Sequence, residues 1–191
     1  MIKSTDIELL PKKVAIFPLT GAVLFPGTQL PLNIFEPRYV QMIDDALASP
    51  GRVIGMIQPS KPGEKTLKKV GCLGRISTFN EAEDNRYLIT LSGTIRFEVK
   101  EELNTTTSYR QIIPHYDMYE SDLKPQHVES IDRSKLLALV KKYLENRKIM
   151  ADWEIIKDTP TEQLINYSGI LVPFTAEEKQ LLLESKTIIT R

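Results

Sequence analysis

The sequence predicts an α+β fold in which strands come first and helices follow, and three observations lead to this prediction. Ten of the 12 prolines and all but one of the 9 glycines precede residue 126, and both residues are disfavoured inside helices. Residues 86–100 alternate apolar and polar side chains with the period of a strand. Beyond residue 126, apolar residues recur at helical spacing. We therefore expect two subdomains, a strand-rich one over 1–125 and a helical one over 126–191.

The strand-rich part contains several apolar or alternating runs. We expect strands over Val14–Phe17, Leu30–Phe35, Val53–Ile57, Val70–Phe79, Arg86–Lys100 and Tyr109–Tyr116. Residues 81–85 are polar and are expected to form the turn between two of these strands. Gly93 falls on the apolar side of the longest run, which indicates a bulge or bend. A long bent strand of this kind is typical of barrels.

One helix is expected between the strands. Pro37 suits its first turn, where the missing N–H has no partner to lose. Val40, Ile43 and Leu47 follow at helical spacing, and Pro50 with Gly51 ends the run.

The last third predicts helices over 127–147, Pro160–Leu171 and Ala176–Glu184. The first has one apolar stripe, made of Leu136, Leu139, Val140, Tyr143 and Leu144. The other two are each preceded by a Thr-x-x-Glu capping box, beginning at Thr159 and Thr175. The space between helices should be filled by Trp153, Ile156, Leu164, Ile165, Leu181 and Leu182.

Charge and cysteine content restrict the function class. Lys and Arg total 25 and Asp and Glu total 25, and each subdomain is separately balanced. Binding to nucleic acid or to an anionic membrane usually needs a basic excess, so neither is expected. The lysine cluster at Lys61, Lys65, Lys68 and Lys69 lacks aromatic residues and is interpreted as a solvated loop. A single cysteine and no long apolar run favour a cytoplasmic protein without a membrane span.

Catalytic motifs are missing from the sequence. It has neither a phosphate-binding G-x-x-x-x-G-K-[ST] loop nor a G-x-S-x-G elbow. His115 and His127 are not accompanied by cysteine, so no metal and no cofactor are expected. Cys72 lies in a strand-like run and is interpreted as a small buried hydrophobe; a nucleophile is the alternative.

Two stretches carry a family resemblance. Residues 16–27 read IFPLTGAVLFPG and residues 30–39 read LPLNIFEPRY. They resemble the signature of the Lon-type amino-terminal domain family, P-L-x3-V-[LV]-[FL]-P-G followed by P-L-x-I-F-E-x-R-Y. Later landmarks at 55–57, 71–75, 87–96 and 173–184 occur in the family's order, so the resemblance extends over about 12–185.

The resemblance implies a PUA-like β-barrel with one inserted helix, followed by a helical bundle. It also implies the substrate-recognition part of an ATP-dependent protease without its ATPase and protease domains. The expected function is therefore non-catalytic binding of unfolded or extended polypeptide segments. The chain is expected to have no enzyme activity of its own and to act beside a protease or chaperone. An RNA-binding PUA-like protein and an undetected hydrolase are the alternatives.

Most signature residues are expected to build the fold. Pro18, Pro26 and Gly27 should shape turns. Phe35 is expected in the core, and Glu36 at the N-cap or in the first turn of the helix. Arg38 is expected to pair with a carboxylate or with strand carbonyls, and Tyr39 is a further structural residue of the motif. The functional interpretation concerns Leu24, Phe25 and Pro26, which could form an exposed apolar loop tip that binds peptides.

Overall fold

The computed structural model describes residues 7–84, 86–126 and 128–191. Its strands are β1 (Val14–Pro18), β2 (Gln29–Ile34), β3 (Val53–Ile57), β4 (Val70–Glu81), β5 (Tyr87–Leu103) and β6 (Gln111–His115). Its helices are α1 (Pro37–Ala48), α2 (Arg133–Asn146), α3 (Trp153–Asp158), α4 (Thr161–Leu171) and α5 (Ala176–Glu184), with 3₁₀ turns η1 (Ile7–Leu9) and η2 (Asp117–Leu123). The α+β class and the strand-before-helix order are confirmed.

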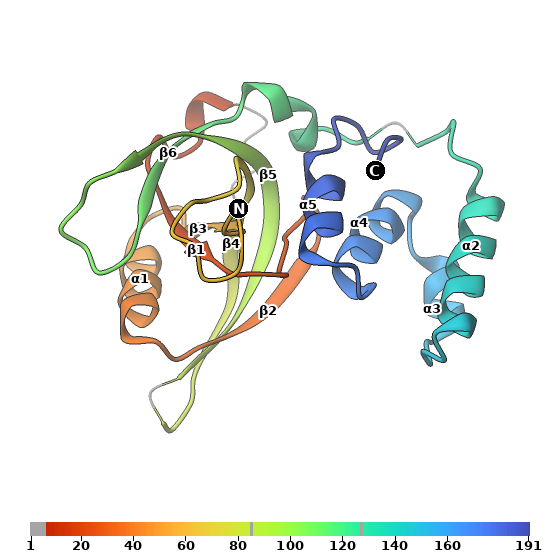
Figure 1. Ribbon diagram of the computed structural model, residues 1–191, viewed down its shortest axis with the longest axis horizontal. Helices are drawn as coiled ribbons and strands as arrows, with labels where there is room; N and C mark the ends of the chain where they lie inside the picture. The colour runs from red at the N-terminus through yellow and green to blue at the C-terminus, as the bar shows by residue number, and fades with distance from the viewer. Residues whose placement is uncertain (1–6, 85, 127) are drawn as a thin grey trace.

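The strands form one mixed sheet in the order β2-β5-β4-β3-β1-β6. β1 and β3 are parallel, and the other paired neighbours are antiparallel. β5 also pairs with β6, so the pairings lead from β1 through β3, β4, β5 and β6 back to β1. In Figure 1, α1 lies on one side of the sheet, while α5 and α4 lie between the sheet and the more distant α2 and α3.

β5 bends where its glycine predicts. Gly74 pairs with Gly93 and Leu73 pairs with Ile95, so Thr94 is an extra residue in the ladder. Gly93 also meets the loop that precedes β2, because its N–H donates to the carbonyl of Thr28 over 2.9 Å. A Cβ at Gly93 would lie 2.0 Å from the Phe25 carbonyl oxygen, which only glycine avoids.

Helix α1 follows the expected pattern. Pro37 lies in its first turn, and Glu36 is the N-cap. The Glu36 carboxylate makes no capping hydrogen bond and instead pairs with Arg38 over 2.7 Å, which matches the carboxylate partner expected for Arg38. The buried side of the helix presents Tyr39, Met42, Ile43 and Ala46 to the core.

The prediction that Phe35 belongs to the core is wrong. Its side chain is 64% exposed, whereas the preceding Ile34 is buried. Successive side chains of a strand point to opposite faces, so Ile34 takes the inward position at the end of β2 and Phe35 points outward.

The helical part differs from the sequence prediction at its helix starts. α2 begins at Arg133, where the Asp132 carboxylate accepts from the Lys135 N–H over 3.0 Å. His127, expected near this start, lies outside the described residues. The prediction of a capping box at Thr159 is wrong. Pro160 is the N-cap of α4, and the Thr159 hydroxyl donates to the Ile155 carbonyl at the end of α3. The box from Thr175 to Glu178 is confirmed.

The interior between the helices is thinner than expected. α2 has no buried residue, and Leu139 in its apolar stripe is exposed. Leu181, expected to pack between helices, is also exposed, whereas Leu183 is buried against the sheet. The buried core is therefore concentrated between the sheet, α1 and α5, and Leu164 on α4 is buried outside this core cluster.

The outer edge of the sheet at β2 is protected. Pro31 lies within β2 and supplies no N–H donor. The N–H of Gln29 donates to the Tyr167 hydroxyl over 3.2 Å, so a helix residue covers the start of the strand. Both features discourage pairing of this edge with another extended chain.

Candidate functional site

The segment expected as an exposed apolar tip is buried. Leu24, Phe25 and Pro26 are all inaccessible to solvent, so the expectation of an exposed peptide-binding tip is wrong. α4 covers the segment: a Cβ at Gly169 would come within 2.5 Å of the Phe25 ring. The sequence gives no signal that a helix about 140 residues later packs on this loop, because the contact depends on the tertiary arrangement.

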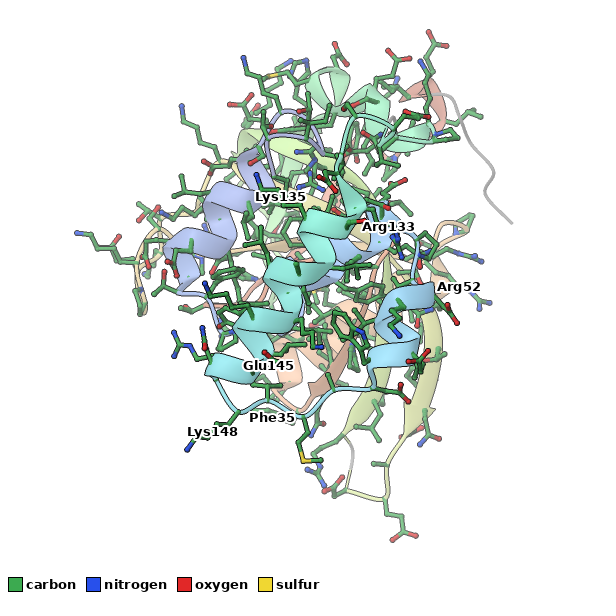
Figure 2. The ribbon with its side chains drawn as sticks, turned by 90° about the vertical axis from the view of Figure 1, so that its right-hand side faces the viewer. Phe35, Arg52, Arg133, Lys135, Glu145 and Lys148 are labelled. Atoms are coloured by element: carbon green, nitrogen blue, oxygen red, sulfur yellow. The ribbon has the colours of Figure 1, made fainter. Side chains whose placement is uncertain are left out.

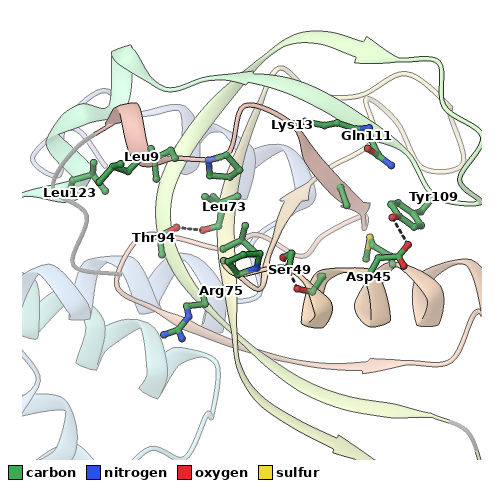
Figure 3. A pocket seen from close by; sticks show the side chains of 18 of the residues that line it. Leu9, Lys13, Asp45, Ser49, Leu73, Arg75, Thr94, Tyr109, Gln111 and Leu123 are labelled. Atoms are coloured by element: carbon green, nitrogen blue, oxygen red, sulfur yellow. Dashed lines mark hydrogen bonds between the residues drawn. The ribbon is translucent and has the colours of Figure 1, made fainter. Parts of the chain in front are cut away.

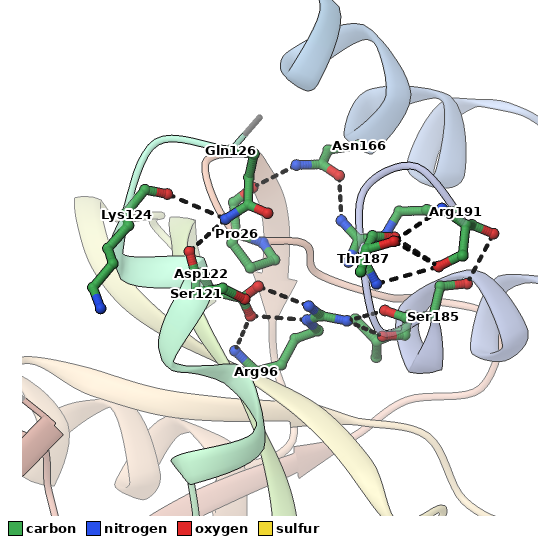
Figure 4. A network of polar contacts seen from close by, with 12 residues as sticks. Pro26, Arg96, Ser121, Asp122, Lys124, Gln126, Asn166, Ser185, Thr187 and Arg191 are labelled. Carbon is green, nitrogen blue, oxygen red and sulfur yellow. Dashed lines mark hydrogen bonds and ion pairs between the residues drawn. The ribbon is translucent and has the colours of Figure 1, made fainter. Parts of the chain in front are cut away.

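Polar contacts hold the same segment in place (Figure 4). The Asn166 side-chain amide donates to the Pro26 carbonyl over 3.0 Å. The Arg191 guanidinium stacks 4.9 Å from the centre of the Phe25 ring and donates to the Asn166 side-chain oxygen. Burial lowers the pKa of Arg191 to about 10, with the neighbouring cation Arg96 as a smaller cause. The segment joins the sheet to the helices.

Arg96 forms a second connection between the sheet and the helices. Its side chain on β5 is buried and donates from Nε and Nη2 to the two carboxylate oxygens of Asp122 over 2.8 and 2.7 Å. Its Nη1 donates to the carbonyls of Leu183 and Ser185 at the end of α5 over 3.0 and 2.5 Å. The guanidinium therefore connects β5, η2 and α5 in one network, visible in Figure 4.

The other signature residues lie in structural positions. Pro18 ends β1, and Gly27 has a φ of 73°, a conformation that glycine adopts without strain. Tyr39 packs edge-on against Phe17, with ring centres 4.5 Å apart. These residues therefore serve the fold: Pro18 and Gly27 at a strand end and a turn, and Tyr39 in the packing of α1 against β1.

A large, mainly apolar cavity opens between α1, the segment around η1 and the strands (Figure 3). Its volume is about 850 Å³, within the range of small-molecule and peptide-side-chain sites. Its apolar lining comes from η1 and its neighbours, α1, the strands and η2, and consists of Leu9, Leu10, Pro11, Ala15, Met42, Ala46, Pro50, Val53, Leu73 and Leu123. Sequence reasoning missed this cavity, because its lining residues are spread along the chain.

A polar pair lies at one end of the cavity. The Tyr109 hydroxyl donates to Asp45 on α1 over 2.6 Å. Burial, followed by this hydrogen bond, raises the pKa of Tyr109 to about 12. In Figure 3 this pair lies toward one end of the cavity, and Leu9, Thr94 and Arg75 lie toward the other. The cavity is thus an apolar chamber with different polar groups at its two ends.

A second apolar surface lies on the helices. Its exposed side chains are Leu139, Ile149, Met150, Ile155 and Leu171. Figure 2 shows α2 in front on this side, with the charged Arg133, Lys135, Glu145 and Lys148 along it and Phe35 below. None of these five apolar residues lines the cavity between α1 and the strands.

The groups considered for chemistry are placed apart from the cavity or are unreactive. Cys72 is fully buried, and burial strongly raises the pKa of its thiol, as expected for a small core residue. His115 is half-exposed and lies 3.2 Å from the Asp117 carboxylate. Across residues 7–84, 86–126 and 128–191, no three His, Cys, Asp or Glu side chains gather as metal ligands. In the same ranges, no helix has the length and apolar character needed to cross a bilayer.

Comparison with known proteins identifies relatives over nearly the whole chain. Residues 13–191 match the family described as the ATP-dependent protease La (LON) substrate-binding domain. A Lon protease of Flavobacterium johnsoniae is 28% identical in a match that covers 92% of this chain and 22% of that protein. Lon protease 2 of Sorangium cellulosum is 35% identical over 92 residues, or 46% of this chain and 11% of that protein. The chain thus spans less than a quarter of these relatives.

Solved structures show the same fold. The Lon N-terminal domain protein from Xanthomonas campestris matches with a TM-score of 0.65 and 20% identity, covering 92% of each chain. The N-terminal domain of the Mycobacterium avium complex Lon protease matches with a TM-score of 0.64 and 19% identity, covering 93% of this chain and 92% of that chain.

Proposed function

Because the chain belongs to the ATP-dependent protease La (LON) substrate-binding domain family, we propose that it is a non-catalytic module that binds unfolded or extended polypeptide segments. The apolar cavity of about 850 Å³ is the observation that carries this proposal. Binding there would transfer apolar side chains of the partner from water into an apolar chamber. A partner protease or chaperone would then process the bound polypeptide.

The contacts of Phe25 and Arg96 connect the strand-rich part of the chain to its helical part. We place the strand-rich subdomain at 1–125, as a PUA-like barrel, and the helical subdomain at 126–191. The ring of strand pairings supports the barrel assignment. Phe25 and Arg96 tie both parts together, so the helices support the sheet that forms much of the cavity.

The test compares two matched surface variants. Leu9 at the cavity is 73% exposed and Leu171 on α4 is 75% exposed, so both accept a charge without loss of the fold. We expect Leu9→Asp to weaken binding of reduced, carboxymethylated lactalbumin about tenfold, the value of one lost apolar side-chain contact. Leu171→Asp should bind like the unaltered chain. Fluorescence anisotropy with the labelled unfolded protein measures both.

Three outcomes decide the proposal. Loss only in the Leu9 variant supports the cavity. Loss only in the Leu171 variant would assign binding to the helical surface and reject the cavity. Binding no stronger than that of an unrelated globular protein would reject polypeptide binding itself.

A further inference from the structure

Arg75 is a charged group of the cavity whose Nε has no hydrogen-bond partner in the described part of the chain. It lies on β4 and lines the cavity. Its Nε is buried, and within the described residues it is the one buried side-chain nitrogen or oxygen without a hydrogen bond. Buried donors are almost always paired, and an unpaired donor on a cation is costly. Such an exception at a cavity points to a group that the bound partner supplies.

The acids that line the cavity are already engaged. Both carboxylate oxygens of Asp122 accept from Arg96. Asp45 accepts from Tyr109 toward the opposite end of the chamber. Among the described residues no ion pair joins Arg75 to either carboxylate, so its charge is available to an anion entering the cavity.

The lining next to Arg75 is apolar, so the part of the ligand that follows the anionic group should be apolar as well. Leu73 and Val53 lie beside Arg75 in the sheet, since Val53 is its paired residue on β3. Met42 extends the apolar wall toward α1. A fitting partner therefore carries a carboxylate at one end of an apolar segment.

We propose that the cavity binds the carboxyl-terminal end of a polypeptide with apolar last residues, and that Arg75 pairs with its terminal carboxylate. This rests on the proposed polypeptide-binding function and specifies which part of the polypeptide is bound. A guanidinium matches a carboxylate in planar geometry and can donate two hydrogen bonds to it. Capture of a chain end by its carboxylate is a general mode of peptide recognition.

A chain end also suits the cavity better than an internal segment does. An internal segment must enter and leave, and every peptide group that it buries in an apolar chamber needs a hydrogen-bond partner. A chain end enters once and carries its anion at its tip. It buries fewer peptide groups than a segment that also has to leave the chamber, and Arg75 can pair with its carboxylate.

The experiment compares one labelled decapeptide ending in Ala-Leu-Val-Leu as the free acid and as the carboxyl-terminal amide. Fluorescence anisotropy gives both affinities for the unaltered chain and three variants. We expect the free acid to bind about tenfold more tightly than the amide, a typical value for a hydrogen bond to a charged group. Arg75→Gln should bring this ratio to about one, while Arg75→Lys keeps part of it. Arg52→Gln is the matched control, because Arg52 is exposed and lies outside the cavity lining.

The outcomes separate this inference from the proposed function. Equal binding of acid and amide by the unaltered chain would overturn the inference and leave polypeptide binding intact. Loss of the ratio in the Arg52 variant as well would also overturn it. Displacement of the peptide by dodecanoate at lower concentration than by unlabelled peptide acid would reassign the cavity to fatty acids. If neither the peptides nor the unfolded protein bind, the proposed function itself falls. If Arg75→Gln does not fold, the acid-to-amide ratios of the unaltered chain and of Arg75→Lys decide.

Discussion

Arg96 and Asp122 form a two-pronged ion pair in the interior, with side chains only 2% and 4% exposed. The same guanidinium donates to two carbonyls at the end of α5, so the pair joins the sheet to the last helix. Removing one partner of a buried pair leaves an uncompensated charge. We expect Asp122→Asn to lower the free energy of unfolding by about 3–5 kcal/mol, measured by urea denaturation.

The exposed pair between Arg110 and Glu102 is the matched control. Its side chains are 30% and 44% exposed, so solvent screens the interaction. We expect Glu102→Gln to change the free energy of unfolding by less than about 1 kcal/mol. A similar loss in Asp122→Asn and Glu102→Gln would contradict the role assigned to the Arg96 network.

The direction of the stability change on replacing Gly169 of α4 tests its contact with Phe25. In an exposed helix, replacing glycine by alanine stabilises by about 1 kcal/mol. Here the added Cβ would lie 2.5 Å from the Phe25 ring, so we expect Gly169→Ala to destabilise the protein by about 1–3 kcal/mol. Thermal unfolding of Gly169→Ala, Phe25→Leu and the double variant measures the coupling. If Phe25→Leu does not relieve the loss, the contact is not its cause.

Local patterns predicted the parts of the fold that local physics determines. The alternation along most of β5, the proline at the start of α1 and the Thr175 capping box all act within a few residues, and each is present in the structure. The alternation is wrong at Arg96, which falls in the polar set but is buried by its contacts with η2 and the end of α5. The Thr159 box failed because Thr159 is the C-cap of the short helix α3, which the sequence analysis did not predict.

Long-range packing determined what the sequence did not predict. Phe25 is apolar and lies in a loop, which fits an exposed tip as well as a buried joint. Its burial depends on Gly169 and Arg191, more than a hundred positions later. The cavity was missed for the same reason, because Leu9, Val53 and Leu123 meet only in the folded chain.

The capping box of α5 predicts a dependence of stability on pH. The Thr175 backbone N–H and hydroxyl both bond to the Glu178 carboxylate and lower its pKa below the ordinary value. A carboxyl with a depressed folded pKa contributes stability above its unfolded pKa and loses it as pH falls through the folded pKa. We therefore expect unfolding free energies of the parent and Glu178→Gln to converge between about pH 5 and pH 3.

Glu177→Gln is the control for that experiment. It removes the same charge one position earlier in the first turn of α5, outside the capping box. Its difference from the parent should vary less over the same pH interval than that of Glu178→Gln. Identical pH profiles for the two variants would show that net charge, and not the box, controls the effect.

Nucleic-acid binding can be tested by measuring how RNA retention depends on salt concentration. Lys61 pairs with Glu64 over 3.6 Å, and the chain carries 25 basic and 25 acidic residues. We expect single-stranded RNA to be retained no better than by a neutral control protein at low salt. Retention that falls steeply with added salt would indicate phosphate contacts and support an RNA-binding function.

Cys72 reports on global opening of the sheet. It is fully buried in β4, and burial raises the pKa of its thiol, so the reactive thiolate is scarce in the folded protein. We expect negligible reaction with Ellman's reagent at pH 8 in buffer and rapid reaction of one thiol in guanidinium chloride. Because the side chain lies in the core, the slow reaction in buffer should accelerate in Asp122→Asn, by about tenfold for each 1.4 kcal/mol of lost stability. Fast labelling of the unaltered chain would show that β4 opens locally, independently of the Arg96 network.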